Sequence, residues 1–267
     1  MEDKMKIEDV REMGIELEHW LKMRVHPVAV KFLKSKDDVP DGAVIPKKDL
    51  GHKLALCQAF SMSEDGNEKM IAMFKEDHYC FEPVIGLGLI KKQEGFFDGT
   101  HRYPDSAITL EAGAEWCKNM PYMKEGLYSG IVTAPIHKVN FMPDLIFMHV
   151  NGLMLTYLLI VKNYIDGKDL YCQLSGHAAC VYALVPAMNE RKCKVTIPCR
   201  GDRTFARAQD DDMMFTMVPE MLPDFINGMH FEQKNGWGLP TKRQIKEEYP
   251  LLPRYEEYGR KLGLLDD

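Results

Sequence analysis

Four cysteines are the residues of this chain best suited to hold a functional centre. Cys57, Cys80, Cys180 and Cys199 lie far apart in the sequence. The wide spacing argues against zinc fingers and ribbons, whose ligands come in close Cys-x-x-Cys pairs, and against the compact cysteine run of ferredoxins. Four thiolates from distant loops would suit an iron–sulfur cluster, because thiolate is a soft ligand that binds iron and sulfide well.

Cys180 is expected to lie in the first turn of a helix. Ser175 is predicted to cap this helix, and His177 precedes Cys180 by three residues, on the same helical face. The positive end of a helix stabilises a thiolate, which suits both metal binding and nucleophilic attack. His177 is therefore a candidate proton donor or a neighbour of the cluster, although a histidine in a capping turn can equally have a surface role.

Two arginines follow Cys199. Arg200 is its direct neighbour and Arg203 comes three residues after that, and positive charge beside a thiol favours the thiolate. We expect Arg200, Arg203 and His177 to tune the potential of a cluster or to bind an anionic substrate. For any one cysteine taken alone, the alternative interpretation is a small buried hydrophobic residue.

These residues predict an oxidoreductase or electron carrier with a 4Fe–4S cluster held by the four cysteines. If three cysteines bind the cluster, the open iron would act as a Lewis acid on a substrate, as in a lyase. Two other classes stay open. One is a non-enzymatic module that binds a small ligand or a partner, and the other is a metal-free enzyme with Cys180 or Cys199 as the nucleophile. The sequence names neither a substrate nor an electron-transfer partner, and it is compatible with a homo-oligomer.

The composition excludes some classes of protein. The chain has 267 residues and a net charge of −6, without a long basic run, so nucleic-acid binding is not expected. The charged segment Met1–Asp9 lacks the features of a secretory signal, which predicts a cytoplasmic location. The apolar segment Phe141–Val161 contains polar groups that a membrane span would expose to lipid, so we expect a buried strand and helix instead. The seven cysteines are then free for metal or redox chemistry.

Hydrophobic patterning predicts a single compact α/β domain, with α+β as the alternative. The strands are predicted at residues 28–33, 131–136, 144–150, 194–197 and 213–218. The helices are predicted at residues 9–23, 67–75, 107–120 and 152–165, after Ser175, and from Pro219 toward Gly228. Residues 231–267 are expected to form a peripheral helical tail.

A weak internal repeat divides the predicted domain into halves at residues 24–126 and 127–230. In each half a proline precedes an apolar strand, and two cysteines follow. The paired cysteines are separated by 22 residues in the first half and 18 in the second. This order suggests that each half contributes two thiols to a shared site.

The motifs of both halves resemble the uncharacterised family known as domain of unknown function 169. The resemblance spans about residues 10 to 230 and includes no known catalytic signature. It implies that the four cysteines named above fall at the motif cysteines of the family, whereas Cys117, Cys172 and Cys193 do not. The motifs that carry it are Pro27-Val28-Ala29-Val30-Lys31-Phe32, Leu56-Cys57-Gln58-Ala59, Cys80 with Gly86-Leu87-Gly88, Ala134-Pro135, Pro143-Asp144, Ser175-Gly176-His177-Ala178-Ala179-Cys180 and Pro198-Cys199-Arg200-Gly201-Asp202-Arg203.

Overall fold

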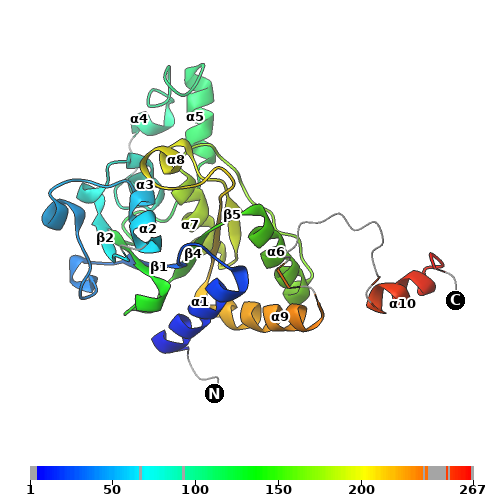
Figure 1. The fold of residues 1–267 in the computed structure, drawn as a ribbon. Helices are drawn as coiled ribbons and strands as arrows, with labels where there is room; N and C mark the ends of the chain where they lie inside the picture. The colour runs from blue at the N-terminus through cyan, green and yellow to red at the C-terminus, as the bar shows by residue number, and fades with distance from the viewer. Residues whose placement is uncertain are drawn as a thin grey trace.

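A six-stranded antiparallel sheet forms the centre of the protein (Figure 1). The computed structural model describes residues 5–65, 68–91, 94–236, 238–239, 251 and 253–265. Along the sheet the strands follow the order β2-β3-β1-β4-β6-β5, and each strand is antiparallel to its neighbours. The strands are β1 (Val28–Leu33), β2 (Ile71–Phe74), β3 (Gly130–Pro135), β4 (Leu145–Val150), β5 (Lys194–Thr196) and β6 (Met213–Met217).

Strands β1 and β4 lie side by side at the middle of the sheet. Their residues are mainly aliphatic or aromatic, which suits a pleated surface, and almost all are buried. The absence of a polar face shows that helices cover both sides of the sheet, as expected for apolar strands without alternation. The predictions for β1, β3, β4, β5 and β6 are confirmed to within two residues.

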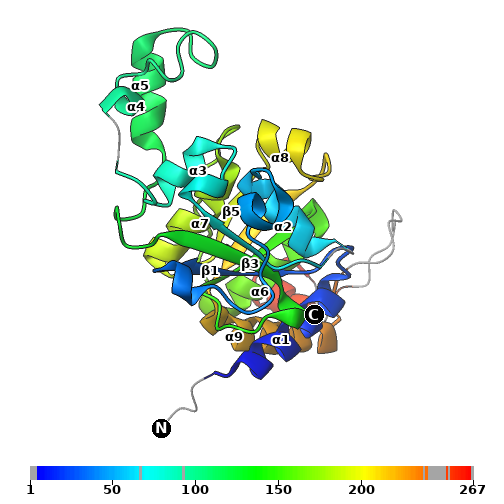
Figure 2. The same cartoon turned by 90° about the vertical axis from the view of Figure 1, so that its left-hand side faces the viewer.

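Helices pack on the two faces of the sheet (Figures 1 and 2). One face is covered by α1 (Ile7–Leu21), α6 (Gly152–Asp166) and α9 (Leu222–Lys234). The other face is covered by α2 (Leu56–Glu64), α3 (Phe81–Gly86) and α7 (Ala179–Glu190), with α8 (Arg200–Phe205) against α2. The helices α4 (Glu94–Phe97) and α5 (Leu110–Asn119) extend away from the sheet beyond α3 (Figure 2). This arrangement confirms the α/β fold class and the single compact domain.

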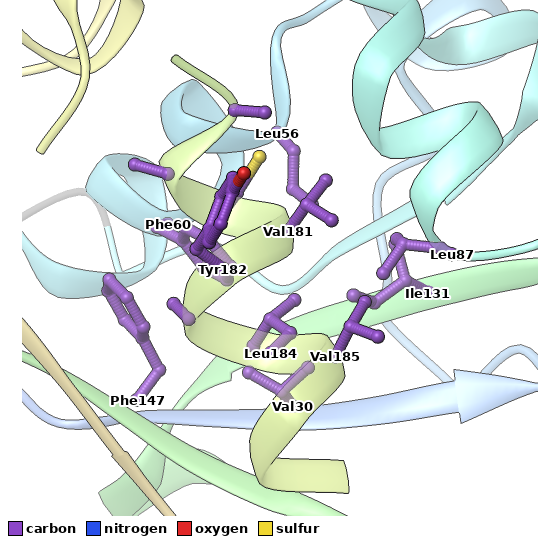
Figure 3. Close-up of a cluster of buried hydrophobic side chains, with 14 of the residues drawn as sticks. Val30, Leu56, Phe60, Leu87, Ile131, Phe147, Val181, Tyr182, Leu184 and Val185 are labelled. Atoms are coloured by element: carbon purple, nitrogen blue, oxygen red, sulfur yellow. The ribbon is translucent and has the colours of Figure 1, made fainter. Parts of the chain in front are cut away.

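Helix α7 is buried between the sheet and the neighbouring helices (Figure 3). Leu184 and Val185 lie over Val30 and Ile131 of the sheet, and all four side chains belong to one buried cluster. Full burial of an aliphatic side chain stabilises a fold by about 1.5–3 kcal/mol. The packing therefore fixes the start of α7, where Cys180 lies, relative to the sheet.

The two halves of the sheet have the same topology. Each contains three strands, with the third strand between the first two, a helix (α2 or α7) directly before the second strand and a short helix (α3 or α8) after it. The first half adds α4 and α5 before β3, and the second adds α6 after β4. The register repeats as well, because the pair Ile71 and Thr133 corresponds to the pair Lys194 and Thr216. The predicted internal repeat is thus present in the fold. The topology divides the chain between β3 and β4, whereas the sequence placed the division at residue 126.

Two predictions about local structure are wrong. Residues 67–75 were expected to be helical, but Ile71–Phe74 form β2, an edge strand buried on both faces. Met, Ala and Lys favour helices as isolated residues, and pairing with β3 overrides that preference. Ser175 does not cap α7, because the helix begins later and its N-cap is Ala178 in a left-handed conformation.

The C-terminal region begins with a buried helix. Residues 231–234 still belong to α9, which packs against α6 and α1. The predicted helical tail over residues 231–267 is helical in α10 (Pro253–Lys261), which has no buried residue, while residues 240–250 of this prediction lie outside the described residues. None of the described helices has the length and apolar character needed to cross a bilayer.

Candidate functional site

The four candidate cysteines lie at the starts of four helices. Cys57 is the second residue of α2, and Cys180 is the second residue of α7. Cys80 precedes α3 and Cys199 precedes α8, each as the N-cap residue. Each half of the fold therefore places one cysteine in the first turn of a helix, α2 or α7, and one at the cap of a short helix, α3 or α8.

The four thiols interact electrostatically with one another. Burial raises the pKa of Cys57, and Asp202, Cys199 and Cys80 raise it further. Burial also raises the pKa of Cys180 well above its ordinary value, and Asp202 and the other three thiols add to the effect. One thiol can change the pKa of another only if the two lie near each other. The predicted shared site requires the same proximity. In the described part of the chain, however, no three cysteine sulfurs lie within 4.8 Å of one another, as the ligands of a single ion would.

Burial and a neighbouring carboxylate oppose the thiolate form that the arginines and the helix starts were expected to favour. Burial raises the pKa of Cys199, and the carboxylate of Asp202 raises it further by charge and hydrogen bonding. The side chains of Arg200 and Arg203 are exposed, and Arg203 Nη1 donates a hydrogen bond to the backbone oxygen of Gln209 at 2.6 Å. Desolvation and a nearby carboxylate therefore outweigh the arginines and the helix termini.

Two buried carboxylates accompany the cap cysteines. Cys80 Sγ donates to Glu82 Oε2 at 2.7 Å, and Glu82 Oε1 accepts a hydrogen bond from Arg102 Nη2 at 2.8 Å. Asp202 is 1% exposed, and its Oδ2 accepts a hydrogen bond from the backbone N–H of Cys199 at 2.8 Å. Asp202 Oδ1 is buried and has no hydrogen-bond partner among the described residues. Both short helices thus carry an acidic residue in the first turn, next to a thiol.

His177 lies just before α7, beside an aromatic side chain. Its ring makes an edge contact with Trp116 at 5.7 Å between centroids. Burial lowers the pKa of His177, and the positive charges of Arg102 and Arg200 contribute to the lowering. The Arg102 guanidinium lies 3.7 Å from the centre of the Trp116 ring. Arg102 therefore connects Trp116 and His177 with the pair formed by Glu82 and Cys80.

The sequence did not identify Glu82 or Arg102 as site residues. They are twenty residues apart, and a short spacing pattern does not connect them. Both carboxylates do follow a candidate cysteine closely in the sequence. Glu82 comes two positions after Cys80, and Asp202 comes three positions after Cys199.

The remaining cysteines have other surroundings. Burial raises the pKa of Cys117, and the positive charge and hydrogen bond of Arg102 act in the opposite direction. The pKa of Cys193 is raised to about 11 by burial, with a further contribution from Cys172. Neither Cys172 nor Cys193 lies at the start of a helix, and Cys117 is inside α5. All seven cysteines are free of disulfide bonds.

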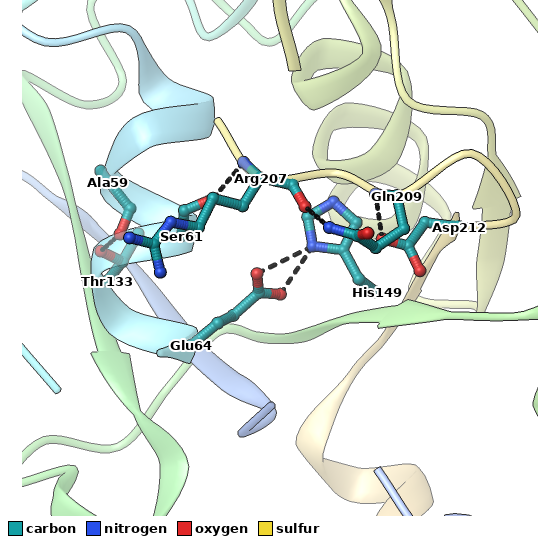
Figure 4. A network of polar contacts seen from close by, with 8 residues as sticks. All are labelled: Ala59, Ser61, Glu64, Thr133, His149, Arg207, Gln209 and Asp212. Carbon is teal, nitrogen blue, oxygen red and sulfur yellow. Dashed lines mark hydrogen bonds and ion pairs between the residues drawn. The ribbon is translucent and has the colours of Figure 1, made fainter. Parts of the chain in front are cut away.

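A polar cavity of about 350 Å³ lies at the other end of α2 (Figure 4). At its wall, His149 Nδ1 lies 2.8 and 2.9 Å from the two carboxylate oxygens of Glu64. Burial acts to lower the pKa of His149, but the charge and hydrogen bond of Glu64, with the charges of Asp202 and Asp212, raise it overall. In the sequence, His149 was one of the polar residues within the apolar segment Phe141–Val161. No sequence pattern indicated a role for Glu64.

A second group of polar side chains lies at the surface. His26, Glu68 and His137 place their ligand atoms within 4.8 Å of one another. The His26 Nε2 atom lies 3.6 Å from Glu68, and the His137 Nε2 atom lies 3.5 Å from it. Glu68 also forms an ion pair with Lys138. The Lys138 ammonium group is paired with the carboxylate that a metal ion would have to bind. We therefore interpret these side chains as an ion-pair network.

Comparison with known proteins identifies relatives of unknown activity. The family model of domain of unknown function 169, described as an uncharacterised ArCR family, matches residues 16–228. The uncharacterized protein MJ0308 of Methanocaldococcus jannaschii is 24% identical over 233 residues, which covers 86% of this chain and 97% of that protein. No solved structure matches the chain. The resemblance noted from the motifs is therefore confirmed.

Proposed function

The chain belongs to domain of unknown function 169, and we propose that it is an iron–sulfur protein with a redox role. Cys57, Cys80, Cys180 and Cys199 would hold a 4Fe–4S cluster as thiolates. The observation that carries this proposal is the equivalent placement of two thiols in each half, together with their effects on one another's ionisation. Cys117, Cys172 and Cys193 lack the repeated placement.

A cluster would set conditions on both the spacing and the ionisation of the thiols. Each thiolate of such a cluster binds a different iron, so the sulfurs stand further apart than the ligands of one ion. In the described residues no three cysteine sulfurs lie within 4.8 Å of one another, so the proposal requires the wider spacing of a cluster. The thiols are protonated without metal, and binding would release their protons, so incorporation should weaken at low pH.

The neighbouring carboxylates would influence the potential of the cluster. Asp202 acts on Cys57, Cys180 and Cys199, and Glu82 acts on Cys80. Negative charge close to a cluster disfavours the added electron and lowers the reduction potential. We therefore propose a low-potential electron carrier or reductase, with His177, Arg200 and Arg203 at the periphery of the site.

Two alternatives follow if fewer cysteines bind metal. If only three cysteines bind the cluster, Cys80 is the one we expect not to bind iron, because its thiol already donates a hydrogen bond to Glu82. An iron left open there would act as a Lewis acid in a lyase. A metal-free enzyme with Cys180 or Cys199 as the nucleophile is disfavoured, because both thiols have raised pKa values and the nucleophile is the thiolate.

We also propose that the protein works in the cytoplasm with a small-molecule substrate or an electron-transfer partner. The seven free cysteines fit a reducing compartment. The net charge of −6 disfavours binding to nucleic acid.

The test is the metal content of protein purified without oxygen. We expect brown protein that contains iron and acid-labile sulfide in equal amounts, with a paramagnetic signal after reduction. Colourless protein that cannot be reconstituted with iron and sulfide would refute the proposal, and would favour a binding module whose cysteines only pack.

Single cysteine variants identify the ligands. Cys57→Ala and Cys180→Ala should lose iron. Cys193→Ala is the matched control, because Cys193 is equally buried and lies outside the repeated positions. Equal iron in all three variants would contradict the ligand assignment even if the wild-type protein contains a cluster.

A further inference from the structure

The cavity beside Glu64 and His149 combines residues from both halves of the fold (Figure 4). Glu64 is the last residue of α2, and His149 lies near the end of β4. Arg24 comes from the connection between α1 and β1, and Arg207 comes from the segment after α8. With a volume of about 350 Å³, the cavity has the size of a site for a small molecule.

Glu64 fixes the orientation of the His149 ring. The side chains of both residues are 5% exposed, and both carboxylate oxygens of Glu64 face His149 Nδ1. A carboxylate at Nδ1 holds a proton on that nitrogen and supports the imidazolium form, as the orienting acid does in a catalytic triad. His149 Nε2 is the ring atom left to act on a ligand.

His149 Nε2 is buried and has no hydrogen-bond partner in the described part of the protein. A buried polar atom without a partner destabilises the fold unless a water molecule or a ligand satisfies it. The pKa of His149 is raised overall, which favours a proton on Nε2. The atom is thus a buried donor at the wall of a cavity, and it would be satisfied by a ligand with an acceptor oxygen.

The charges around the cavity cancel, so recognition of an anion would depend on individual donors and not on net positive charge. Arg24, Arg207 and the His149 imidazolium are balanced by three carboxylates, Glu64, Asp65 and Asp212. Asp65 already pairs with Arg207 at 2.9 Å, and Asp212 Oδ2 accepts a hydrogen bond from the backbone N–H of Gln209 at 2.7 Å.

Arg24 has an exposed side chain at the rim of the same cavity. A guanidinium group matches the two oxygens of a carboxylate. A doubly charged phosphate would meet the three acidic residues at higher electrostatic cost.

We propose that this cavity binds a small organic carboxylate, with His149 Nε2 donating a hydrogen bond to one ligand oxygen and Arg24 pairing with the carboxylate. Val25 and Met154 also line the cavity and offer contact to the hydrocarbon part of the ligand. The Nε2 proton of His149, supported by the Glu64 carboxylate at Nδ1, would make the ring a general acid for a substrate bound here. This inference stands without the iron–sulfur proposal, because it uses none of the cysteines.

The experiment measures binding of acetate and propionate to the full chain, with inorganic phosphate as the comparison anion. Binding is followed by calorimetry and by the ¹⁵N signals of the His149 ring. We expect either carboxylate to bind more tightly than phosphate and to raise the pKa of His149. Arg24→Gln should weaken carboxylate binding by about tenfold, the size of one charge-assisted interaction.

Two further variants separate a binding role from a structural one. Lys48→Gln removes one exposed positive charge outside the cavity and should leave carboxylate binding unchanged. His149→Gln should abolish binding. If that variant does not fold, Arg24→Gln and the ring signals of the wild-type protein still decide the question. Carboxylate binding that is equal in the wild-type, Arg24→Gln and Lys48→Gln proteins, tighter binding of phosphate, or no response of the His149 ring would overturn the proposal.

Discussion

Replacement of Gly86 with alanine should separate two of the helices that carry the candidate cysteines. Gly86 ends α3, which Cys80 caps, and it faces Val181 of α7, directly after Cys180. A Cβ atom at residue 86 would lie 2.5 and 2.8 Å from the two Cγ atoms of Val181. Neither distance is tolerated between carbon atoms, so α3 or α7 must move.

The expected loss of stability follows from this overlap. Insertion of a methyl group into a packed contact costs about 1–3 kcal/mol. Alanine recovers up to about 1 kcal/mol relative to glycine in a helix, and less at a helix end. We therefore expect Gly86→Ala to destabilise the protein by about 1–2 kcal/mol. The same movement should displace Cys80 from Cys180 and reduce iron occupancy.

A double-mutant cycle with Val181→Ala tests the origin of the effect. Val181→Ala alone removes two methyl groups from a fully buried side chain and should cost about 1–3 kcal/mol. In the double variant the new methyl group has room, so we expect a favourable coupling of about 1–2 kcal/mol and recovery of iron. Gly201→Ala is the control, because its Cβ would meet Cys199 Sγ at an ordinary 3.4 Å.

The measurements are urea unfolding without oxygen and iron content per chain for the four variants. If Gly86→Ala unfolds at the same urea concentration as the wild-type protein, α3 and α7 do not approach as closely as described. If stability falls but Val181→Ala gives no coupling, the contact with Val181 is not the cause.

Three other predictions concern charge and pH. Asp202→Asn should lower the pKa of the Cys199 thiol, so alkylation of metal-free protein by iodoacetamide at pH 8 should be faster than in the wild type; an unchanged rate would exclude the carboxylate as a cause. The raised pKa of His149 gives stability that is full below the unfolded value and is lost as pH rises through the folded value, so the wild-type melting temperature should fall across that range. Glu64→Gln leaves burial as the main influence, which lowers the pKa of His149, so melting temperature should instead fall as pH decreases; a profile parallel to the wild type would contradict this. Reconstitution with iron and sulfide should fail progressively as pH is lowered, because the thiols must lose their protons, and pH-independent uptake would argue against thiolate ligands.

The sequence predicted the parts of the fold whose pattern is strong in a single segment. The apolar strand at β4 and the Asn151-capped helix after it were predicted almost to the residue, because capping and hydrophobic length are local properties. Strand β2 was missed because four buried residues show neither a helical nor an alternating pattern. Its identity depends on pairing with β3, about sixty residues later.

For the candidate sites, too, the sequence indicated some features, and others depend on the folded structure. The four cysteines were recognisable because their residue type and order repeat along the chain. Their ionisation was not predictable, because it depends on burial and on Asp202, and burial is a property of the folded protein. Glu64 and His149 are 85 residues apart and follow no spacing rule, so their pairing needed the structure.

The repeated sheet carries information about ancestry. With β1 equivalent to β4 and α2 equivalent to α7, residues shift by 117 from Val28 to Leu145 and by 123 from Leu56 to Ala179. These shifts are what gene duplication would leave, and an unduplicated chain would have formed a dimer with a twofold axis between its first strands. The same shifts map His149 onto Phe32 and Glu64 onto Ala187, both buried. Of these two pairs of equivalent positions, one pair therefore forms a polar cavity wall and the other lies in the hydrophobic core.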